Sequence, residues 1–140
     1  MYCVPGWNLF HPGILISGDL MCRIMITEDE HIIAEDLKLT LQSFGHEIVE
    51  VVSTGEKAIS IALQTKPDLI FMDIKLAGAI NGLDAAREIT RVFDVPIIFC
   101  SAYCDQKTYD EVSLLRTAGY INKPFRVEDI EQAILQVVDV

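Results

Sequence analysis

Short apolar runs alternate with longer amphipathic stretches from residue 23 onward, and this alternation constrains the fold more than any other feature of the chain. Several runs are continuously apolar, which is typical of strands buried on both faces of a parallel sheet. The stretches between them place apolar residues at helical spacing. The sequence therefore predicts five successive strand–helix units.

The apolar runs mark the expected strands, and the amphipathic stretches mark the expected helices. The strands are expected at residues 24–26, Glu47–Val52, Leu69–Asp73, Ile97–Ser101 and 120–122. The helices are expected at residues 33–44, 54–66, 83–93, 106–117 and beyond Pro124. Five units in so short a chain favour an open sheet over a barrel. We predict an α/β fold, a doubly wound, flavodoxin-like parallel sheet of five strands in the order 2-1-3-4-5 with helices on both faces.

One expected helix differs from the others in its apolar stripe. The segment 106–117 has the weakest stripe, with Tyr109, Val112 and Leu115 expected to face inward. A weak stripe buries little apolar surface. We therefore expect the docking of this helix to be adjustable.

The size and charge of the chain limit the classes of protein to which it can belong. Its 140 residues suffice for one hydrophobic core and are too few for two ordinary domains. A formal net charge of −10 argues against binding to nucleic acid or anionic membranes, because both depend on clustered Lys and Arg. Residues 1–20 lack Lys and Arg and are interrupted by Pro5 and Pro12, so neither a signal peptide nor a membrane span fits. We interpret them as an irregular arm or extension, followed by one domain at residues 21–140; the alternatives are a strip that docks a partner and a start codon assigned upstream of Met21.

The cysteines and histidines show no metal-binding pattern. The four cysteines include no CxxC pair and no paired spacing of a structural zinc site. We expect reduced thiols in a cytoplasmic protein. The three histidines, His11, His31 and His46, are scattered along the chain and are expected on the surface.

The ends of the expected strands carry groups suited to phosphoryl chemistry. Parallel strands end at one edge of the sheet, so Glu28, Asp29, Asp73, Ser101 and Lys123 are expected to meet there. Grouped carboxylates repel one another, whereas a hard divalent cation stabilises their ionised forms together. We predict Mg²⁺, with Mn²⁺ as an alternative, and Asp73 as a nucleophile that forms an acyl phosphate. Ser101 would hydrogen-bond one phosphoryl oxygen while Lys123 neutralises another.

Four short motifs stand in order at these strand ends: TEDE at 27–30, FMDIKL at 71–76, FCSA at 99–102 and GYINKPF at 119–125. Together they strongly resemble the receiver domain of bacterial two-component response regulators, of the chemotaxis-receiver kind. The resemblance runs from about residue 21 to residue 140. The sequence departs from the family pattern after FMDIKL, where Ala follows the leucine and Pro is frequent in the family.

The resemblance implies roles for individual residues. The implied roles are phosphoacceptor for Asp73, cation ligands for Glu28, Asp29, Asp73 and the Lys75 backbone carbonyl, catalytic support from Lys123 and Ser101, and switching by Ser101 and Tyr120. In this family the proline after the lysine is typically cis.

The resemblance also implies a signalling protein rather than an enzyme, one that at most catalyses its own phosphorylation and dephosphorylation. The phosphoryl donor would be the phosphohistidine of a sensor histidine kinase or a phosphotransfer protein. The signal would leave through a downstream protein partner or a homodimer, at a face formed by residues 106–117, 120–122 and the helix beyond Pro124. No direct contact with nucleic acid or membrane is expected.

Rival classes fail on specific residues. A phosphatase of the haloacid dehalogenase type would need an aspartate at the position of Lys75, and a dinucleotide-binding domain would need GxGxxG where TEDE stands at 27–30. Taken singly, each acidic residue could be an ordinary helix-start or turn residue. The remaining alternative is a degenerate receiver that acts as a constitutive interaction module, although such domains usually lack part of the set of acids, acceptor and lysine that is present here.

Overall fold

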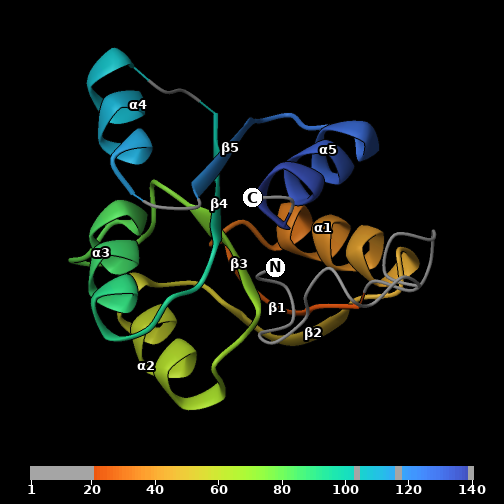
Figure 1. Cartoon of the computed structure of the whole chain (residues 1–140), viewed down its shortest axis with the longest axis horizontal. Helices are drawn as coiled ribbons and strands as arrows, with labels where there is room; N and C mark the ends of the chain where they lie inside the picture. The colour runs from red at the N-terminus through yellow and green to blue at the C-terminus, as the bar shows by residue number, and fades with distance from the viewer. Residues whose placement is uncertain (1–20, 103–104, 116–117, 139–140) are drawn as a thin grey trace.

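The computed structural model describes residues 21–102, 105–115 and 118–138. In this part of the chain five parallel strands form one sheet, in the order β2-β1-β3-β4-β5 (Figure 1). The strands are β1 (Arg23–Thr27), β2 (Glu47–Val52), β3 (Leu69–Asp73), β4 (Ile97–Ser101) and β5 (Ala118–Asn122). The predicted fold class and strand order are confirmed. The expected arm at 1–20 lies outside the described residues.

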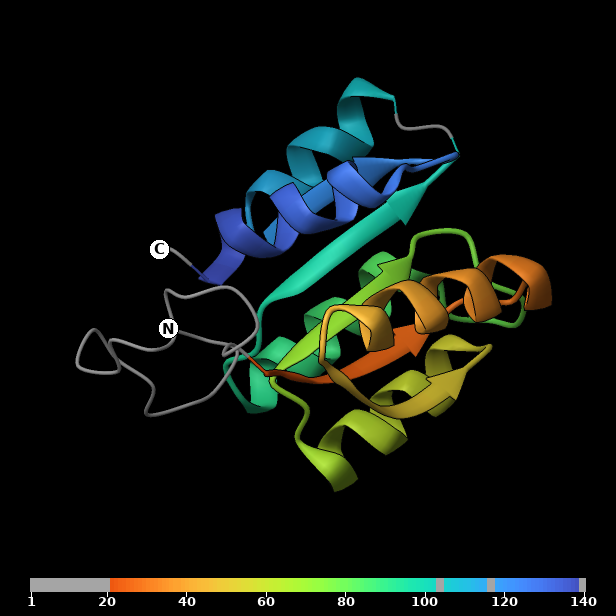
Figure 2. The same cartoon turned by 90° about the vertical axis from the view of Figure 1, so that its right-hand side faces the viewer.

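Helices cover both faces of the sheet. They are α1 (His31–Ser43), α2 (Gly55–Thr65), α3 (Gly82–Val92), α4 (Gln106–Ser113) and α5 (Val127–Val138). Figures 1 and 2 show α1 and α5 on one face, with α2, α3 and α4 on the other. A doubly wound sheet leaves its ligand-binding edge at the carboxyl ends of the strands.

The central strands are buried on both sides because their side chains alternate between two hydrophobic clusters. Leu69 and Phe71 of β3 pack with α1 and α5, whereas Ile70 and Met72 pack with α2 and α3. Full burial of such a side chain contributes roughly 1.5–3 kcal/mol. The strand that delivers Asp73 to the edge is therefore firmly fixed.

The helix that was expected to dock weakly shows the largest departures from the sequence-based prediction. α4 ends at Ser113 rather than at residue 117, and residues 116–117 lie outside the described part. Val112 is buried as expected, but Tyr109 is 51% exposed, so the prediction that it faces inward is wrong. Its ring packs edge-on against Tyr120 at the rim of the sheet, with the centroids 6.3 Å apart.

Two further expectations need correction at the opposite end of the sheet. His46 is buried rather than on the surface, because its Nδ1 accepts a hydrogen bond of 3.1 Å from the backbone N–H of Cys22. The expectation of reduced thiols is wrong for Cys22, which is disulfide-bonded, whereas Cys100 keeps a buried free thiol. Among the described residues, no helix is both long enough and apolar enough to cross a membrane.

Candidate functional site

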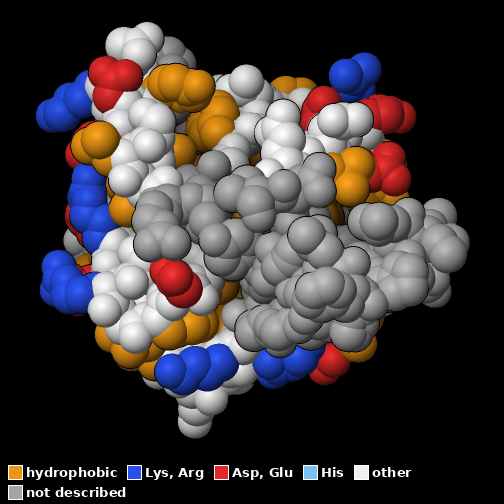
Figure 3. Space-filling model, in the orientation of Figure 1, with side chains coloured by type: hydrophobic (Ala, Val, Ile, Leu, Met, Phe, Trp, Pro, Cys, Tyr) orange, Lys and Arg blue, Asp and Glu red, His pale blue; other side chains and the backbone are white. Residues whose placement is uncertain are grey.

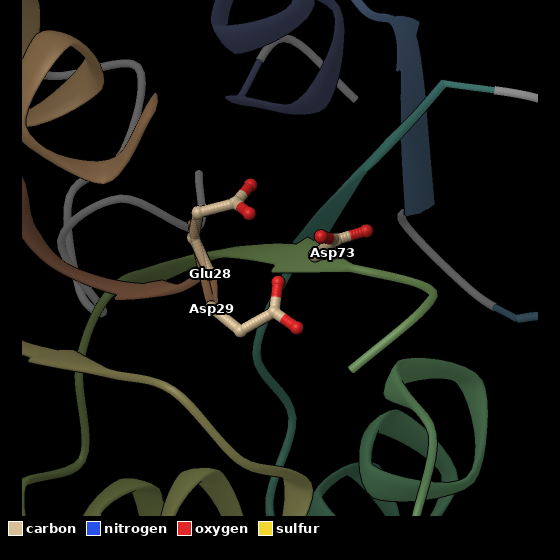
Figure 4. A group of neighbouring side chains, drawn as sticks. All are labelled: Glu28, Asp29 and Asp73. Atoms are coloured by element: carbon tan, nitrogen blue, oxygen red, sulfur yellow. The ribbon is translucent and has the colours of Figure 1, made fainter. Parts of the chain in front are cut away.

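Three carboxylates meet at the carboxyl edge of the sheet (Figure 4). Glu28 and Asp29 follow β1, and Asp73 is the last residue of the neighbouring strand β3. Each offers an oxygen, and these oxygens all lie within 4.8 Å of one another. Glu28 and Asp73 are buried, while Asp29 is exposed. The structure thus brings together the acidic residues that the sequence placed at one edge.

Lys123 joins two of these carboxylates. Its Nζ lies 2.7 Å from Glu28 Oε1 and 3.0 Å from Asp73 Oδ2. Its backbone N–H donates to the Ser101 carbonyl at 2.8 Å, which ties the segment after β5 to the end of β4. The Lys123–Pro124 peptide bond is cis, as the resemblance led us to expect.

Backbone hydrogen bonds orient the same carboxylates. The N–H of Glu30 donates to Glu28 Oε2 at 3.0 Å, and the N–H of Lys75 donates to Asp73 Oδ1 at 3.2 Å. Each buried carboxylate is therefore held by a backbone donor on one oxygen and by Lys123 on the other. Fixed oxygens suit both metal coordination and nucleophilic attack.

The electrostatics of the site follow from burial and charge pairing. Burial raises the pKa of Glu28, and its hydrogen bond with Lys123 opposes this only in part. Burial lowers the pKa of Lys123, but its hydrogen bonds to Glu28 and Asp73 outweigh that effect and raise the pKa overall. Burial also raises the pKa of the Cys100 thiol, which lies beside Asp73 in the sheet and stays protonated.

The charges at this edge do not balance. Three carboxylates against one ammonium leave a formal charge of −2. Clustered carboxylate oxygens are the hard ligands that Mg²⁺ prefers, and a divalent cation supplies the missing charge. The cluster is an acidic pocket of the kind that binds Mg²⁺.

A glycine that sequence reasoning missed fixes the backbone of Asp73. Gly82 begins α3, and its N–H donates to the Ile74 carbonyl at 2.8 Å. A Cβ at this position would lie 1.9 Å from the Asp73 carbonyl oxygen, so the close approach requires glycine. The only sequence signal was the run of small residues before the helix.

The remaining predicted site residues lie at the end of β4, in β5 and directly after β3. Ser101 is buried at the end of β4. The residue before it, Cys100, lies opposite Asp73 in the parallel pairing of β4 with β3. Tyr120 is half-buried in β5, and its hydroxyl donates to Asn122 Oδ1 at 3.0 Å. The roles of Ser101 and Tyr120 in switching, and of the Lys75 carbonyl as a ligand, stay predictions.

Comparison with known proteins identifies the family. The response regulator receiver domain matches residues 24–135, so the chain belongs to this family of two-component signal transduction. Among curated relatives, the phyllosphere-induced regulator PhyR of Methylorubrum extorquens is 36% identical over 127 residues, 90% of this chain and 47% of that protein. The transcriptional regulatory protein PdtaR of Mycobacterium tuberculosis is 38% identical over 115 residues, 80% of this chain and 54% of that protein.

Solved structures agree with this assignment. The receiver domain of PhyR from Erythrobacter litoralis superposes with a TM-score of 0.72 at 30% identity, covering 85% of this chain and 91% of that one. The chain spans about half the length of the curated relatives named above. It is a signalling module rather than a catalytic enzyme, and receiver domains interact with histidine kinases.

Proposed function

We propose that Asp73 accepts a phosphoryl group in the cytoplasm from the phosphohistidine of a sensor kinase or a phosphotransfer protein. The observation that carries this proposal is the convergence of Glu28, Asp29 and Asp73 within 4.8 Å, with Lys123 bridging two of them. The acidic cluster is consistent with a phosphorylation site. We also propose that residues 21–140 form a single domain and that residues 1–20 form an arm before it.

The reaction forms one bond and breaks another. A carboxylate oxygen of Asp73 attacks the phosphorus, the phosphorus–nitrogen bond breaks, and its electron pair leaves with the imidazole, which takes up a proton. Lys123 neutralises a phosphoryl oxygen, and the Ser101 hydroxyl donates a hydrogen bond to another. Glu28, Asp29, Asp73 and the Lys75 carbonyl would hold Mg²⁺, or Mn²⁺ in its place, which would supply positive charge beside the transferred group.

The output of the phosphorylated protein is a protein contact. We propose that Ser101 and Tyr120 bias two packings of the face formed by α4, β5 and α5, which binds a downstream partner or a second copy of the chain. The negative charge of the chain supports protein rather than nucleic-acid or membrane contacts. The alternative, a degenerate receiver, would keep one packing whatever the state of Asp73.

Phosphorylation with acetyl phosphate tests the proposal. The intact mass of the wild-type protein is expected to rise by one phosphoryl group with Mg²⁺ and to stay unchanged in EDTA. Asp73→Asn removes the adduct, whereas Asp36→Asn, at an exposed carboxylate on α1, keeps it. An adduct that survives Asp73→Asn would reject Asp73 as the acceptor. The absence of any adduct on the wild-type protein would favour the degenerate receiver.

A further inference from the structure

Among the residues that the structure describes, few side chains attach α4 to the rest of the domain. Among residues 106–113, all of which are described, only Val112 is buried. The ring of Tyr109 meets Tyr120 at its edge and is otherwise half exposed. A polar attachment joins α4 to α3, because Arg87 Nη2 lies 2.8 Å from Glu111 Oε2. The position of α4 therefore depends on this ion pair more than that of a deeply buried helix would.

Arg87 is held in place before it reaches α4. Its Nη1 donates to Asp84 Oδ1 at 2.8 Å, one turn earlier on α3. The N–H of Asp84 in turn donates to the side chain of Asn81, which caps α3. A guanidinium fixed on one side presents its other nitrogen with little further loss of entropy. The side chains of Arg87 and Glu111 are 39% and 33% exposed, so solvent screens their pairing less than that of a fully exposed pair.

The capped end of α3 is also the end that touches the acceptor strand. Gly82 packs directly on the backbone of Asp73 and bonds to the carbonyl of Ile74. A continuous series of contacts thus runs from Asp73 through the first turn of α3 to Arg87, and from there to Glu111 of α4.

We infer that Arg87 is a positioning residue that ties α4 to α3 and passes a change at Asp73 to α4. The attachment of α4 to α3 by Arg87 is argued from the contacts above. The transmission of a change from Asp73 to α4 rests on the proposed function. In Figure 3, Lys and Arg side chains line the left-hand edge, where Figure 1 places α3 and α4. The residues of α3 and α4 carry charges of both signs, and Arg87 gives Glu111 of α4 a partner on α3.

The same helix offers a matched control. Arg91 pairs with Glu88 at 3.1 Å, but both residues lie on α3, and their side chains are 70% and 49% exposed. Arg91→Ala therefore removes the same charge from the same helix without touching α4.

Amide hydrogen exchange of residues 106–113 tests the tie in the protein without added ligand. Arg87→Ala and Glu111→Ala should each speed exchange in α4 about five-fold, whereas Arg91→Ala leaves it unchanged. The Arg87→Ala/Glu111→Ala double variant should exchange no faster than either single variant, because both remove one interaction. Equal effects of Arg87→Ala and Arg91→Ala, or additive effects in the double variant, would overturn the tie.

Amide chemical shifts with Mg²⁺ and beryllofluoride, a phosphate mimic, test whether a change at Asp73 is transmitted to α4. The wild-type protein and Arg91→Ala should show shifts near Asp73 and in α4, while Arg87→Ala keeps the first set and loses the second. Shifts in α4 that persist in Arg87→Ala would refute the role of Arg87. If the wild-type protein shows no shifts at all, the proposed function fails, and the transmission from Asp73 to α4 fails with it. Hydrogen exchange alone then decides whether Arg87 attaches α4 to α3.

Discussion

Neutralising Asp29 should change the stability of the protein in opposite directions with and without Mg²⁺. Its carboxylate lies within 4.8 Å of those of Glu28 and Asp73, and Lys123 pairs with the other two. At 4.8 Å and an effective dielectric constant of 20, two unit charges repel by about 3.5 kcal/mol. Asp29 is exposed, so solvent screening reduces the net effect to about 1 kcal/mol. Asp29→Asn should therefore raise the free energy of unfolding by that amount in EDTA.

The order of stability of the wild-type protein and Asp29→Asn should reverse when the cation is present. A ligand at 100 times its Kd stabilises the folded state by about 2.7 kcal/mol, and the wild-type protein keeps all three carboxylates that we propose as ligands of the cation. Asp29→Asn lacks one of these proposed ligands, so it should bind the cation more weakly and gain less stability from it. In saturating Mg²⁺ the wild-type protein should become the more stable of the two.

Urea denaturation in EDTA and in MgCl₂, at matched ionic strength, measures both values. Asp36→Asn, at an exposed carboxylate on α1, controls for the general relief of negative charge and should respond to Mg²⁺ as the wild-type protein does. A lower stability of Asp29→Asn than of the wild-type protein in EDTA, or equal stabilisation of both proteins by Mg²⁺, would refute the predicted repulsion and the proposed role of Asp29.

Three other substitutions test buried positions in the fold, two of them near the site and one at the opposite end of the sheet. Gly82→Ala should cost more than about 3 kcal/mol in urea denaturation and slow phosphorylation, because its Cβ would displace the backbone of Asp73. Thr27→Val should raise the free energy of unfolding by about 1 kcal/mol, since among the described residues the buried Thr27 hydroxyl has no hydrogen-bond partner; a loss of stability would show that it has one. Burial lowers the pKa of His46, so the unfolded chain takes up a proton near pH 6.5 while the folded protein does not, and stability should fall from pH 7.5 to 5.5. His46→Gln should flatten this pH dependence and His31→Gln should not.

For three strands, the first and last residues predicted from the sequence are those found in the structure, because the local pattern decides the bounds of these strands. Leu69–Asp73 and Ile97–Ser101 are mainly apolar runs, and in Glu47–Val52 apolar residues are interrupted only by Glu50 after the first residue; each strand ends where turn or helix-start residues begin. The acidic cluster could be predicted from them, since parallel strands bring their carboxyl ends to one edge. The site thus followed from strand order and the residues at the strand ends.

Contacts between distant segments could not be predicted in the same way. The close approach of Gly82 to Asp73 depends on the path of the loop between β3 and α3, where Ala77 also forms an isolated bridge with Thr54. The burial of His46 depends on where the backbone of Cys22 passes. No local pattern encodes such distances.

The uneven anchoring of the helices gives a physical reason for where a signal would leave the domain. Asp73 stands at the end of a fully buried strand and against Gly82, so new charge there cannot be accommodated by moving β3. Within the described part of the chain, the contacts that hold α4 include one buried valine, one aromatic contact and one partly exposed ion pair, together worth roughly 3–5 kcal/mol. Hydrogen bonds to a charged phosphoryl group are worth about 1.5–3 kcal/mol each, so two of them match that attachment. The energy that the proposed phosphoryl group would supply is therefore of the size needed to repack α4.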